Sequence, residues 1–290
     1  EYVKSLHESE EEQRHLYEDL LIRVTEFFRD EEAFSAVAER VLPHLVSDRR
    51  RADGELRVWV PGCATGEEPV SLAILLDELA RSSGQAFDFK VFATDIDPET
   101  VRRASMTRFA KATVDAMGEE RRERYFEVTE HGYQLVSAIR DRIVFAQQDL
   151  VRDPPFTRID LVSCRNVLIY FRPDLQARVL SSLDFALKPG GWLFLGPSET
   201  VGELASRYHA VDTRWKIYRK HAEAKSRLDP DLLARTPSPS LSAVSGSYVR
   251  RESSAMSAER LDYAAVAAAL AEEFLRVCVV LDDGLNVRYV

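Results

Sequence analysis

The sequence predicts an α/β fold in which a parallel sheet carries helices on both faces. Short apolar strands alternate with amphipathic helices between residues 57 and 195, which is the pattern of βαβ units. The composition supports a packed core, because 45% of the 290 residues are hydrophobic and 30% are charged. A wholly disordered or fibrous chain is thereby excluded.

Each expected strand is short, apolar and bounded by turn residues. The ranges are 57–60, 89–93, 143–146, 159–163 and 193–195. Between them, helices are expected to begin at Glu67, at Asp97-Pro98 and at Pro173, where an N-cap or a first-turn proline favours a start. Gly84 is typical of a helix stop, and a turn at 188–191 precedes the last strand.

Further elements are expected on both sides of this core. Residues 10–28 place apolar side chains on one helix face, and a second helix follows from Glu31 with Asp30 as its N-cap. Pro43 should kink or end that helix, and residues 47–55 form a polar loop. After the last strand, residues 209–212 and 215–218 predict a hairpin that closes the sheet edge.

The composition changes near residue 222. Pro and Ser are frequent up to residue 260, as in a linker. Residues 261–290 turn apolar again and predict a helix followed by a hairpin of 277–281 with 287–290. The chain opens without Met or a signal peptide, which indicates a piece of a longer, multidomain protein.

Charge, cysteine and histidine patterns limit the functions open to the chain. Lys and Arg number 39 against 48 Asp and Glu, and the net charge of −9 argues against nucleic acid as a partner. The cysteines Cys63, Cys164 and Cys278 form no CxxC pair and the histidines lack metal-binding spacing, so no metal site is expected. Reduced thiols fit a cytoplasmic protein. No apolar run approaches the roughly 18 residues of a membrane span.

A glycine turn between the first strand and its helix is the first candidate binding feature. The turn at 61–66 contains Gly62 and Gly66, which would let backbone N–H groups approach a ligand. Glu67 and Glu68 follow at once and would repel a pyrophosphate, so the turn suits a ligand with cationic or hydroxyl groups. The alternative is a plain tight turn.

Acidic residues end the second and third strands. Asp95 stands where βαβ nucleotide folds hold a ribose diol. Its neighbour Asp97 caps the helix opened by Pro98, whereas Asp95 has no such local duty, and Asp95 is therefore preferred as the ribose ligand. Asp149 stands where an adenine edge is usually met, and a simple turn role is the alternative.

A polar pair interrupts the apolar run at 163–171. Arg165 and Asn166 follow the carboxyl end of a strand, the edge at which open α/β sheets bind ligands. The alternative is a buried Arg–Asn pair that satisfies loop backbone.

Five motifs, in this order, resemble those of the CheR-type chemotaxis methyltransferases. They are VTEFFRD at 24–30, GCATGEEP at 62–69, ATDID at 93–97, CRNVLIYF at 164–171 and LKPGGWLFLGPSE at 187–199. The resemblance spans about residues 10–220. It implies a Rossmann-like S-adenosylmethionine methyltransferase sheet with an N-terminal helical segment and a small inserted β-subdomain.

The resemblance also implies a reaction and a domain plan. A methyl group would pass from S-adenosylmethionine to glutamates of a methyl-accepting chemoreceptor or related signalling protein, leaving S-adenosylhomocysteine. Residues 1–50 would be the remnant of an N-terminal helical region. The methyltransferase domain would cover 51–221, with its β-insert at about 125–142, and a linker would cover 222–260. Residues 261–290 resemble the start of a truncated PAS-like domain.

The family's cofactor residues can be carried over one by one. They fall on Thr25, Arg29, Glu67, Asp95, Asp149, Leu150, Asn166 and Val167, and the glycine turn adds Gly62. Two residues are catalytic candidates: Arg29 could orient a carboxylate, and Tyr170 either lines the methyl-transfer cleft or belongs to the core.

Two rival classes stay open. The first is a regulatory module that binds S-adenosylmethionine without catalysis. The second is a small-molecule or RNA methyltransferase, of which the acidic balance disfavours RNA. Basic clusters at 49–51, 102–103 and 121–124 could meet an acidic receptor helix or be solvated faces.

Overall fold

The computed structural model describes residues 9, 25–49, 55–84, 87–222, 280–281 and 287–289. The chain forms two compact units, residues 1–237 and 238–290. Most of the expected helix at 10–28, the linker after 222 and most of the segment 261–290 lie outside the described residues. The last four residues of that first helix are described and none is helical: residues 25–26 are irregular and residues 27–28 form a turn.

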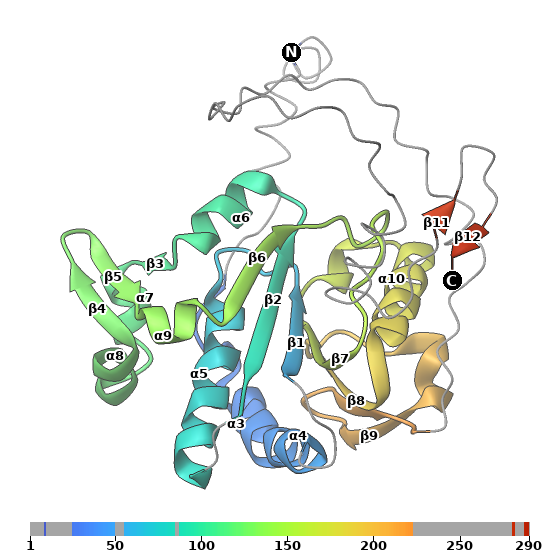
Figure 1. The fold of residues 1–290 in the computed structure, drawn as a ribbon, viewed down its shortest axis with the longest axis horizontal. Coiled ribbons are helices and arrows are strands. Elements are labelled where there is room, and N and C mark those ends of the chain that lie inside the picture. The colour runs from blue at the N-terminus through green and yellow to red at the C-terminus, as the bar shows by residue number, and fades with distance from the viewer. Residues whose placement is uncertain are drawn as a thin grey trace, which may run out of the picture. The chain divides into compact units, whose positions relative to one another are not determined.

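The predicted α/β fold is confirmed by a seven-stranded, mostly parallel sheet (Figure 1). Its parallel strands, in spatial order, are β6 (Ile143–Gln147), β2 (Phe89–Asp95), β1 (Leu56–Pro61), β7 (Ile159–Cys164) and β8 (Leu187–Leu195). The hairpin strands β10 (Ile217–Lys220) and β9 (Tyr208–Asp212) continue the sheet antiparallel, at the edge where a hairpin was expected. The central strands are buried on both faces, which is why they lack a polar–apolar alternation.

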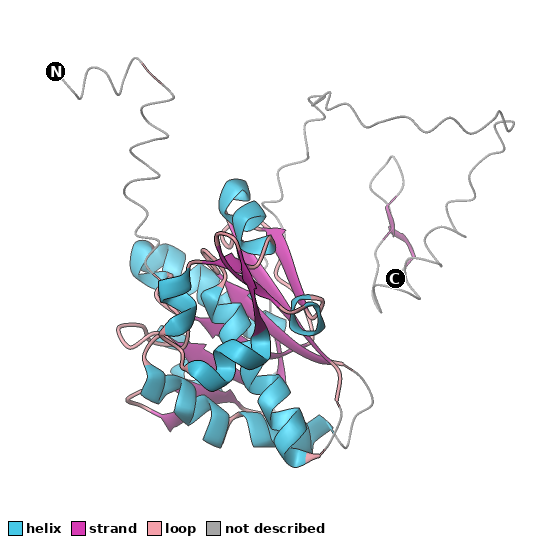
Figure 2. Cartoon of the chain, turned by 90° about the vertical axis from the view of Figure 1, so that its left-hand side faces the viewer, coloured by secondary structure: helices cyan, strands magenta, loops and turns pink. Residues whose placement is uncertain are grey.

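Helices cover both faces of the sheet (Figure 2). One apolar core joins one face to α3 (Glu31–Arg40), α4 (Leu42–Arg49) and α5 (Glu67–Ser83). A second core joins the other face to α10 (Pro173–Ala186), with the short 3₁₀ turns η1 (Leu168–Tyr170) and η2 (Gly202–Arg207) nearby. Helix α6 (Pro98–Ser105) packs beside β2 and β6.

The local expectations around α3 and α4 hold in part. Asp30 is the N-cap residue of α3, as expected, but its side chain makes no cap bond, because its backbone is left-handed and its carboxylate binds Arg165. The expected break at Pro43 is found: α3 ends at Arg40, and Pro43 lies in the first turn of a new helix, α4, where a proline is tolerated. The expected polar loop starts late, because α4 continues to Arg49.

The last parallel strand is longer than expected. The predicted turn at 188–191 lies inside β8, which begins at Leu187 and pairs with Ile159. The register shifts between Ile159 and Leu161, and Gly190 has a φ of 78°. An irregularity of this kind absorbs a Pro-Gly-Gly sequence without ending the strand.

A small inserted sheet projects from the β6 side of the fold (Figure 1). Its order is β3 (Arg108–Phe109), β5 (Gly132–Leu135) and β4 (Phe126–Thr129), and it carries α7 (Lys111–Asp115), α8 (Glu119–Tyr125) and α9 (Ser137–Arg140). The insert that the resemblance implied, at about 125–142, contains β4 and β5 but not β3. The strand β3 was not predicted, because a strand of two residues is too short to show a hydrophobic periodicity.

The described part of the second unit is one strand pair. Strands β11 (Val280–Leu281) and β12 (Val287–Tyr289) pair antiparallel, as the expected hairpin requires. Across the described ranges, no helix combines the length and apolar character needed to cross a bilayer.

Candidate functional site

A cavity of about 400 Å³ opens at the carboxyl ends of β1, β2, β6 and β7. Ligands of open α/β sheets bind at this edge. The residues that line it are Thr25, Arg29, Gly62, Cys63, Ala64, Glu68, Asp95, Ile96, Thr100, Gln148, Asp149, Leu150, Arg165, Asn166, Val167, Ile169, Tyr170 and Phe171.

The cavity brings together most of the side chains that the sequence singled out. The predicted residues in its wall are Thr25, Arg29, Gly62, Asp95, Asp149, Leu150, Asn166, Val167 and Tyr170. Glu67 is the exception. It is buried, and it accepts a hydrogen bond of 2.5 Å from the hydroxyl of Thr65. Its neighbour Glu68 faces the cavity instead, because successive helix residues point in different directions.

The glycine turn lies against the loop at 166–168, which forms another wall of the cavity. Gly62 has a φ of 67°, and a Cβ at this position would lie 2.4 Å from Cγ2 of Val167. Only glycine therefore permits the two loops to approach this closely.

Asp95 is tied to the same turn, which corrects the expectation that it has no local duty. Its Oδ2 accepts a hydrogen bond of 3.0 Å from the N–H of Ala64, and its Oδ1 accepts one from the N–H of Asp97. Asp97 caps α6 as predicted, through bonds from Glu99 and Thr100. The carboxylate of Asp95 thus fixes the turn and still lines the cavity.

Asp149 was expected either to meet the cofactor or to serve as a turn residue, and its position fits both roles. Its Oδ1 accepts bonds from the N–H groups of Val151 and Arg152, so it is a turn residue. It also lines the cavity, beside Leu150.

Arg165 is the buried centre of an ion network. Its guanidinium donates to Asp30 at 2.6 Å and lies 3.5 Å from an oxygen of Glu68, which in turn accepts a bond from Ser163. The Arg165 side chain has no exposed surface. The alternative of an Arg–Asn pair serving loop backbone is therefore wrong, because Arg165 serves carboxylates on two other segments.

Glu199 satisfies the loop backbone instead. Its buried carboxylate accepts hydrogen bonds of 2.6–3.0 Å from four backbone N–H groups, those of Asn166, Val167, Leu168 and Gly196. Asn166 has a left-handed backbone with a φ of 57°. The carboxylate therefore holds an unusual loop shape in the cavity wall.

Arg29 stands between two residues with strained backbones. Phe28 and Asp30 have φ values of 54° and 61°, a conformation that costs about 1–3 kcal/mol per non-glycine residue. The N–H of Phe28 donates to the hydroxyl of Ser71 at 3.0 Å, and Asp30 is held by Arg165. We call residues 25–30 the arginine turn, because it presents Arg29 to the cavity.

Burial and nearby charge set the protonation of two cavity groups. Burial raises the pKa of Glu68, although Arg165, Ser163 and Arg29 oppose the rise. Burial also raises the pKa of the Cys63 thiol far above its ordinary value, and the negative charge of Asp95 adds to the rise. Cys63 is therefore a neutral thiol in this wall.

The rim of the cavity is apolar and open. The exposed fractions are 52% for Tyr170, 48% for Ile169 and 46% for Ile96. Tyr170 is thus a rim residue, and its alternative assignment to the core is excluded.

One buried acceptor in the wall has no protein partner among the described residues. The amide nitrogen of Gln148 donates to the carbonyl of Pro154 at 2.9 Å, while its Oε1 is buried and unpaired. Because a carbonyl can only accept, this bond fixes the amide orientation and leaves the buried Oε1 without a donor among the described residues.

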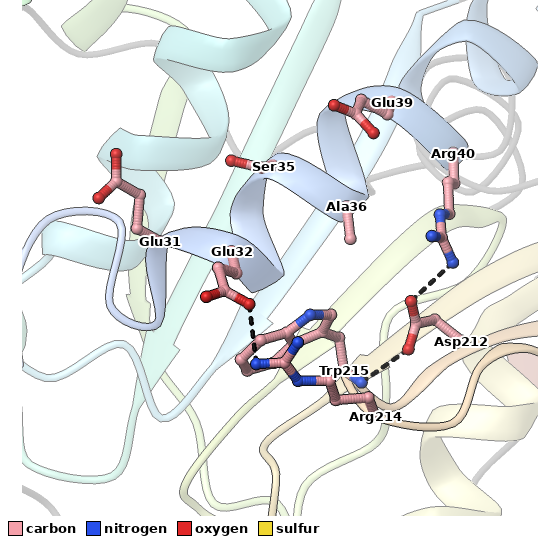
Figure 3. A pocket seen from close by; sticks show the side chains of 9 residues that line it. All are labelled: Glu31, Glu32, Ser35, Ala36, Glu39, Arg40, Asp212, Arg214 and Trp215. Carbon is pink, nitrogen blue, oxygen red and sulfur yellow. Dashed lines mark hydrogen bonds and ion pairs between the residues drawn. The ribbon is translucent and has the colours of Figure 1, made fainter.

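A second groove lies away from these residues (Figure 3). Its volume is about 520 Å³, and it runs between α3 and the β9–β10 turn. Two ion pairs cross it, Arg40 with Asp212 at 2.7 Å and Arg214 with Glu32 at 2.8 Å. The charges within each pair neutralise each other, and both pairs hold α3 against the β9–β10 hairpin.

The fold and the first cavity together define a nucleotide-binding α/β domain. The wall carries carboxylates beside Arg29, and such groups can bind the hydroxyl, cationic and carboxylate groups of a ligand. Residues 23–217 match the family described as CheR methyltransferase, SAM binding domain. The chain belongs to the CheR methyltransferase family, and S-adenosylmethionine is the cofactor of this domain.

Curated relatives agree with this assignment. The chain is 35% identical over 182 residues to a chemotaxis protein methyltransferase of Listeria monocytogenes, covering 63% of this chain and 67% of that protein. It is 32% identical to chemotaxis protein methyltransferase 2 of Vibrio cholerae, covering 75% of this chain and 76% of that one. An uncharacterized 104.1 kDa protein of Rhodobacter capsulatus is 39% identical over 75% of this chain, which spans only 23% of that protein's length.

Among the residues that the sequence did not predict, three polar ones shape the site. Glu199 ends the last motif, Gln148 precedes Asp149, and Glu68 follows Glu67. The spacing of Glu199 from Gly196 gives no local sign of a bond to the loop at 166–168. The only available signal was the presence of charged residues in otherwise apolar stretches.

Proposed function

We propose that this chain transfers a methyl group from S-adenosylmethionine to glutamate side chains of chemoreceptor-type signalling proteins, forming methyl esters. The observation that carries the proposal is the convergence of Arg29 and the exposed Tyr170 on the cofactor cavity of a CheR-family domain. The relatives of Listeria and Vibrio are named chemotaxis methyltransferases, which supports a receptor as the acceptor.

The reaction needs little acid–base chemistry from the protein. When bound, S-adenosylmethionine supplies an electrophilic methyl group on a cationic sulfur. A glutamate acceptor is ionised at neutral pH, with an ordinary pKa of about 4.3, so no general base has to remove a proton. The tasks left to the chain are binding and alignment.

Residues of the cavity wall divide these tasks. Asp95 offers a carboxylate for hydroxyl donors, and Gln148 Oε1 offers a buried acceptor. Arg29 can hold a carboxylate by paired hydrogen bonds. The strained arginine turn keeps that guanidinium in the wall before any ligand arrives.

The apolar rim suits the approach of a helical protein surface. Ile96, Ile169 and Tyr170 are exposed around the mouth. A docked acceptor would cover them and exclude water from the reacting groups, which strengthens every charge interaction inside.

The test is methyl transfer from S-adenosylmethionine labelled in the methyl group to receptor cytoplasmic fragments. We expect label on the receptor that mild base releases as methanol, because esters are base-labile and methylated amines are not. A receptor fragment with its candidate glutamates changed to alanine serves as the matched control and should stay unlabelled.

Two outcomes would contradict the proposal. Base-stable label would identify a different acceptor group. Tight S-adenosylhomocysteine binding without transfer to any receptor fragment would favour a non-catalytic regulatory module.

A further inference from the structure

The inserted sheet touches the arginine turn through aromatic rings. Phe27, in the turn, packs edge-on against Phe109 of β3 at 4.8 Å and Phe126 of β4 at 5.6 Å between ring centroids. Phe109 and Phe126 also contact each other. One residue of the turn is therefore part of the inserted sheet's own core.

The next residue of the turn contacts the insert through a cation. The guanidinium of Arg121, on α8, lies 4.1 Å from the ring centroid of Phe28. The same guanidinium makes two hydrogen bonds of 2.9 Å to the carboxylate of Glu78 on α5. A paired fork of this kind fixes the plane of the guanidinium, and so fixes its place over the ring.

Arg121 differs in this from the other arginines of α8. Arg122 pairs with Asp115 and Glu119, which lie on α7 and α8 themselves. Arg121 contacts both α5, through Glu78, and the arginine turn, through Phe28. The basic cluster predicted at 121–124 is thus largely neutralised by carboxylates, and one member has a contact beyond its helix.

The contact of Arg121 with Phe28 restrains a strained backbone. Phe28 is a bulky residue with a φ of 54°, which a free chain would leave. Its N–H is held by Ser71, and its buried ring lies between Phe34 and Arg121. Release of one of these restraints should let the turn relax and should move Arg29, the following residue, out of the cavity wall.

We propose that Arg121 is a positioning residue for the arginine turn, and that through it the inserted sheet sets the geometry of the cofactor cavity. Arg121 does not line that cavity. It acts through Phe28 on Arg29. A partner that moved α8 would therefore change cofactor binding without touching the cofactor.

The experiment measures binding of S-adenosylhomocysteine to the whole 290-residue chain by calorimetry. We expect Arg121→Ala to raise the Kd about 3- to 10-fold, the range that loss of a partly buried cation–π contact allows, with one ligand still bound per chain. Arg121→Lys should recover part of the affinity, because it keeps the charge over the ring but loses the fork.

Two control variants separate positioning from attachment of the insert. Arg122→Ala removes a neighbouring arginine whose pairs stay within α7 and α8. Tyr125→Phe removes the hydrogen bond of 3.0 Å from Tyr125 to Asp77, which attaches α8 to α5 at a second place. Both should keep the wild-type Kd.

A double-mutant cycle tests the route through Phe28. If Arg121 acts on the ring, Arg121→Ala combined with Phe28→Leu should weaken binding no more than the stronger single change does. Additive losses would overturn the proposed route.

Other outcomes also decide the matter. An Arg121→Ala protein with wild-type Kd would overturn the proposal, and so would one whose loss appears only as fewer binding-competent molecules, because that is a folding defect. If Arg121→Ala does not fold, Arg121→Lys and Glu78→Gln decide by the same Kd criterion. The binding experiment contains no methyl acceptor. Its result therefore does not depend on whether the chain methylates a receptor.

Discussion

The backbone N–H of Ala64 donates a hydrogen bond of 3.0 Å to the carboxylate of Asp95, so the tip of β2 is tied to the glycine turn after β1. One carboxylate therefore shapes the cavity and also faces it. Its loss should affect cofactor binding twice, through a missing acceptor and through a loosened turn.

The first prediction concerns this residue. Asp95→Ala should weaken binding of S-adenosylhomocysteine by about 1–3 kcal/mol, the usual value of a hydrogen bond to a charged group. Calorimetry on the folded variant measures it. Asp97→Ala is the matched control: it should cost about 1 kcal/mol of unfolding free energy as a lost helix cap, and leave the affinity unchanged. If Asp97→Ala weakened cofactor binding and Asp95→Ala did not, the cofactor contact would belong to Asp97.

The second prediction concerns Gly62. Gly62→Ala should abolish measurable cofactor binding, because its Cβ would lie 2.4 Å from Val167 Cγ2 and would push that side chain or the turn aside. Gly84→Ala has a similar φ of 64° but no atom within 4 Å, so it carries the backbone strain alone. The Gly84 variant should lose only about 1 kcal/mol of stability and bind normally. If both variants bound S-adenosylhomocysteine with equal affinity, the close approach of Gly62 to Val167 would not be needed for cofactor binding.

The third prediction concerns the loop at 166–168. Glu199→Gln presents an amide NH₂ to a site built from N–H donors, so at least one buried donor loses its acceptor. We expect the free energy of unfolding in urea to fall by about 3 kcal/mol. Exposed Glu203, four residues on, is the control, and Glu203→Gln should change stability by less than about 0.5 kcal/mol. A Glu199→Gln protein as stable as that control would contradict the role assigned to the carboxylate.

The fourth prediction concerns pH and the Cys63 thiol. Its pKa is raised by burial, and the unfolded value is about 8.5. The folded chain therefore binds this proton more tightly, and the free energy of unfolding should fall as pH rises above about 8.5. At pH 8, iodoacetamide should modify Cys63 only after unfolding, as peptide mass spectrometry can show. Modification of the folded chain at the rate seen in urea would contradict the assignment.

The fifth prediction concerns the extent of the cofactor domain. All cavity residues lie between positions 25 and 171, so a chain ending at 222 should bind S-adenosylhomocysteine with nearly the affinity of the whole chain. Calorimetry on both proteins gives the comparison. A tenfold weaker Kd for the shorter chain would assign residues after 222 a part in the site.

Sequence patterns predict the sheet well, because strands buried on both faces are continuous apolar runs between turn signals. Val58, Val91 and Leu161 all lie in strands at the expected places. The short strand β3 and the interior turn of β8 escaped because pairing partners far along the chain, such as Tyr133 for Phe109, determine them.

The site was predictable where a residue's place follows from a strand end, as for Asp95 and Asn166. Long-range partners could not be predicted. Glu199 bonds to a loop more than thirty residues away, and Arg165 reaches Asp30 across 135 positions. The choice of Glu67 over Glu68 depended on the rotation of α5 against the sheet, and packing sets that rotation.

A crystal structure of the chain with S-adenosylhomocysteine tests the central claim most directly. We predict ligand density in the cavity between the glycine turn and the loop at 166–171, with a ligand hydroxyl within hydrogen-bond distance of Asp95 and a ligand donor facing Gln148 Oε1. Density in the groove between α3 and the β9–β10 turn, with the first cavity empty, would contradict the assignment of the site.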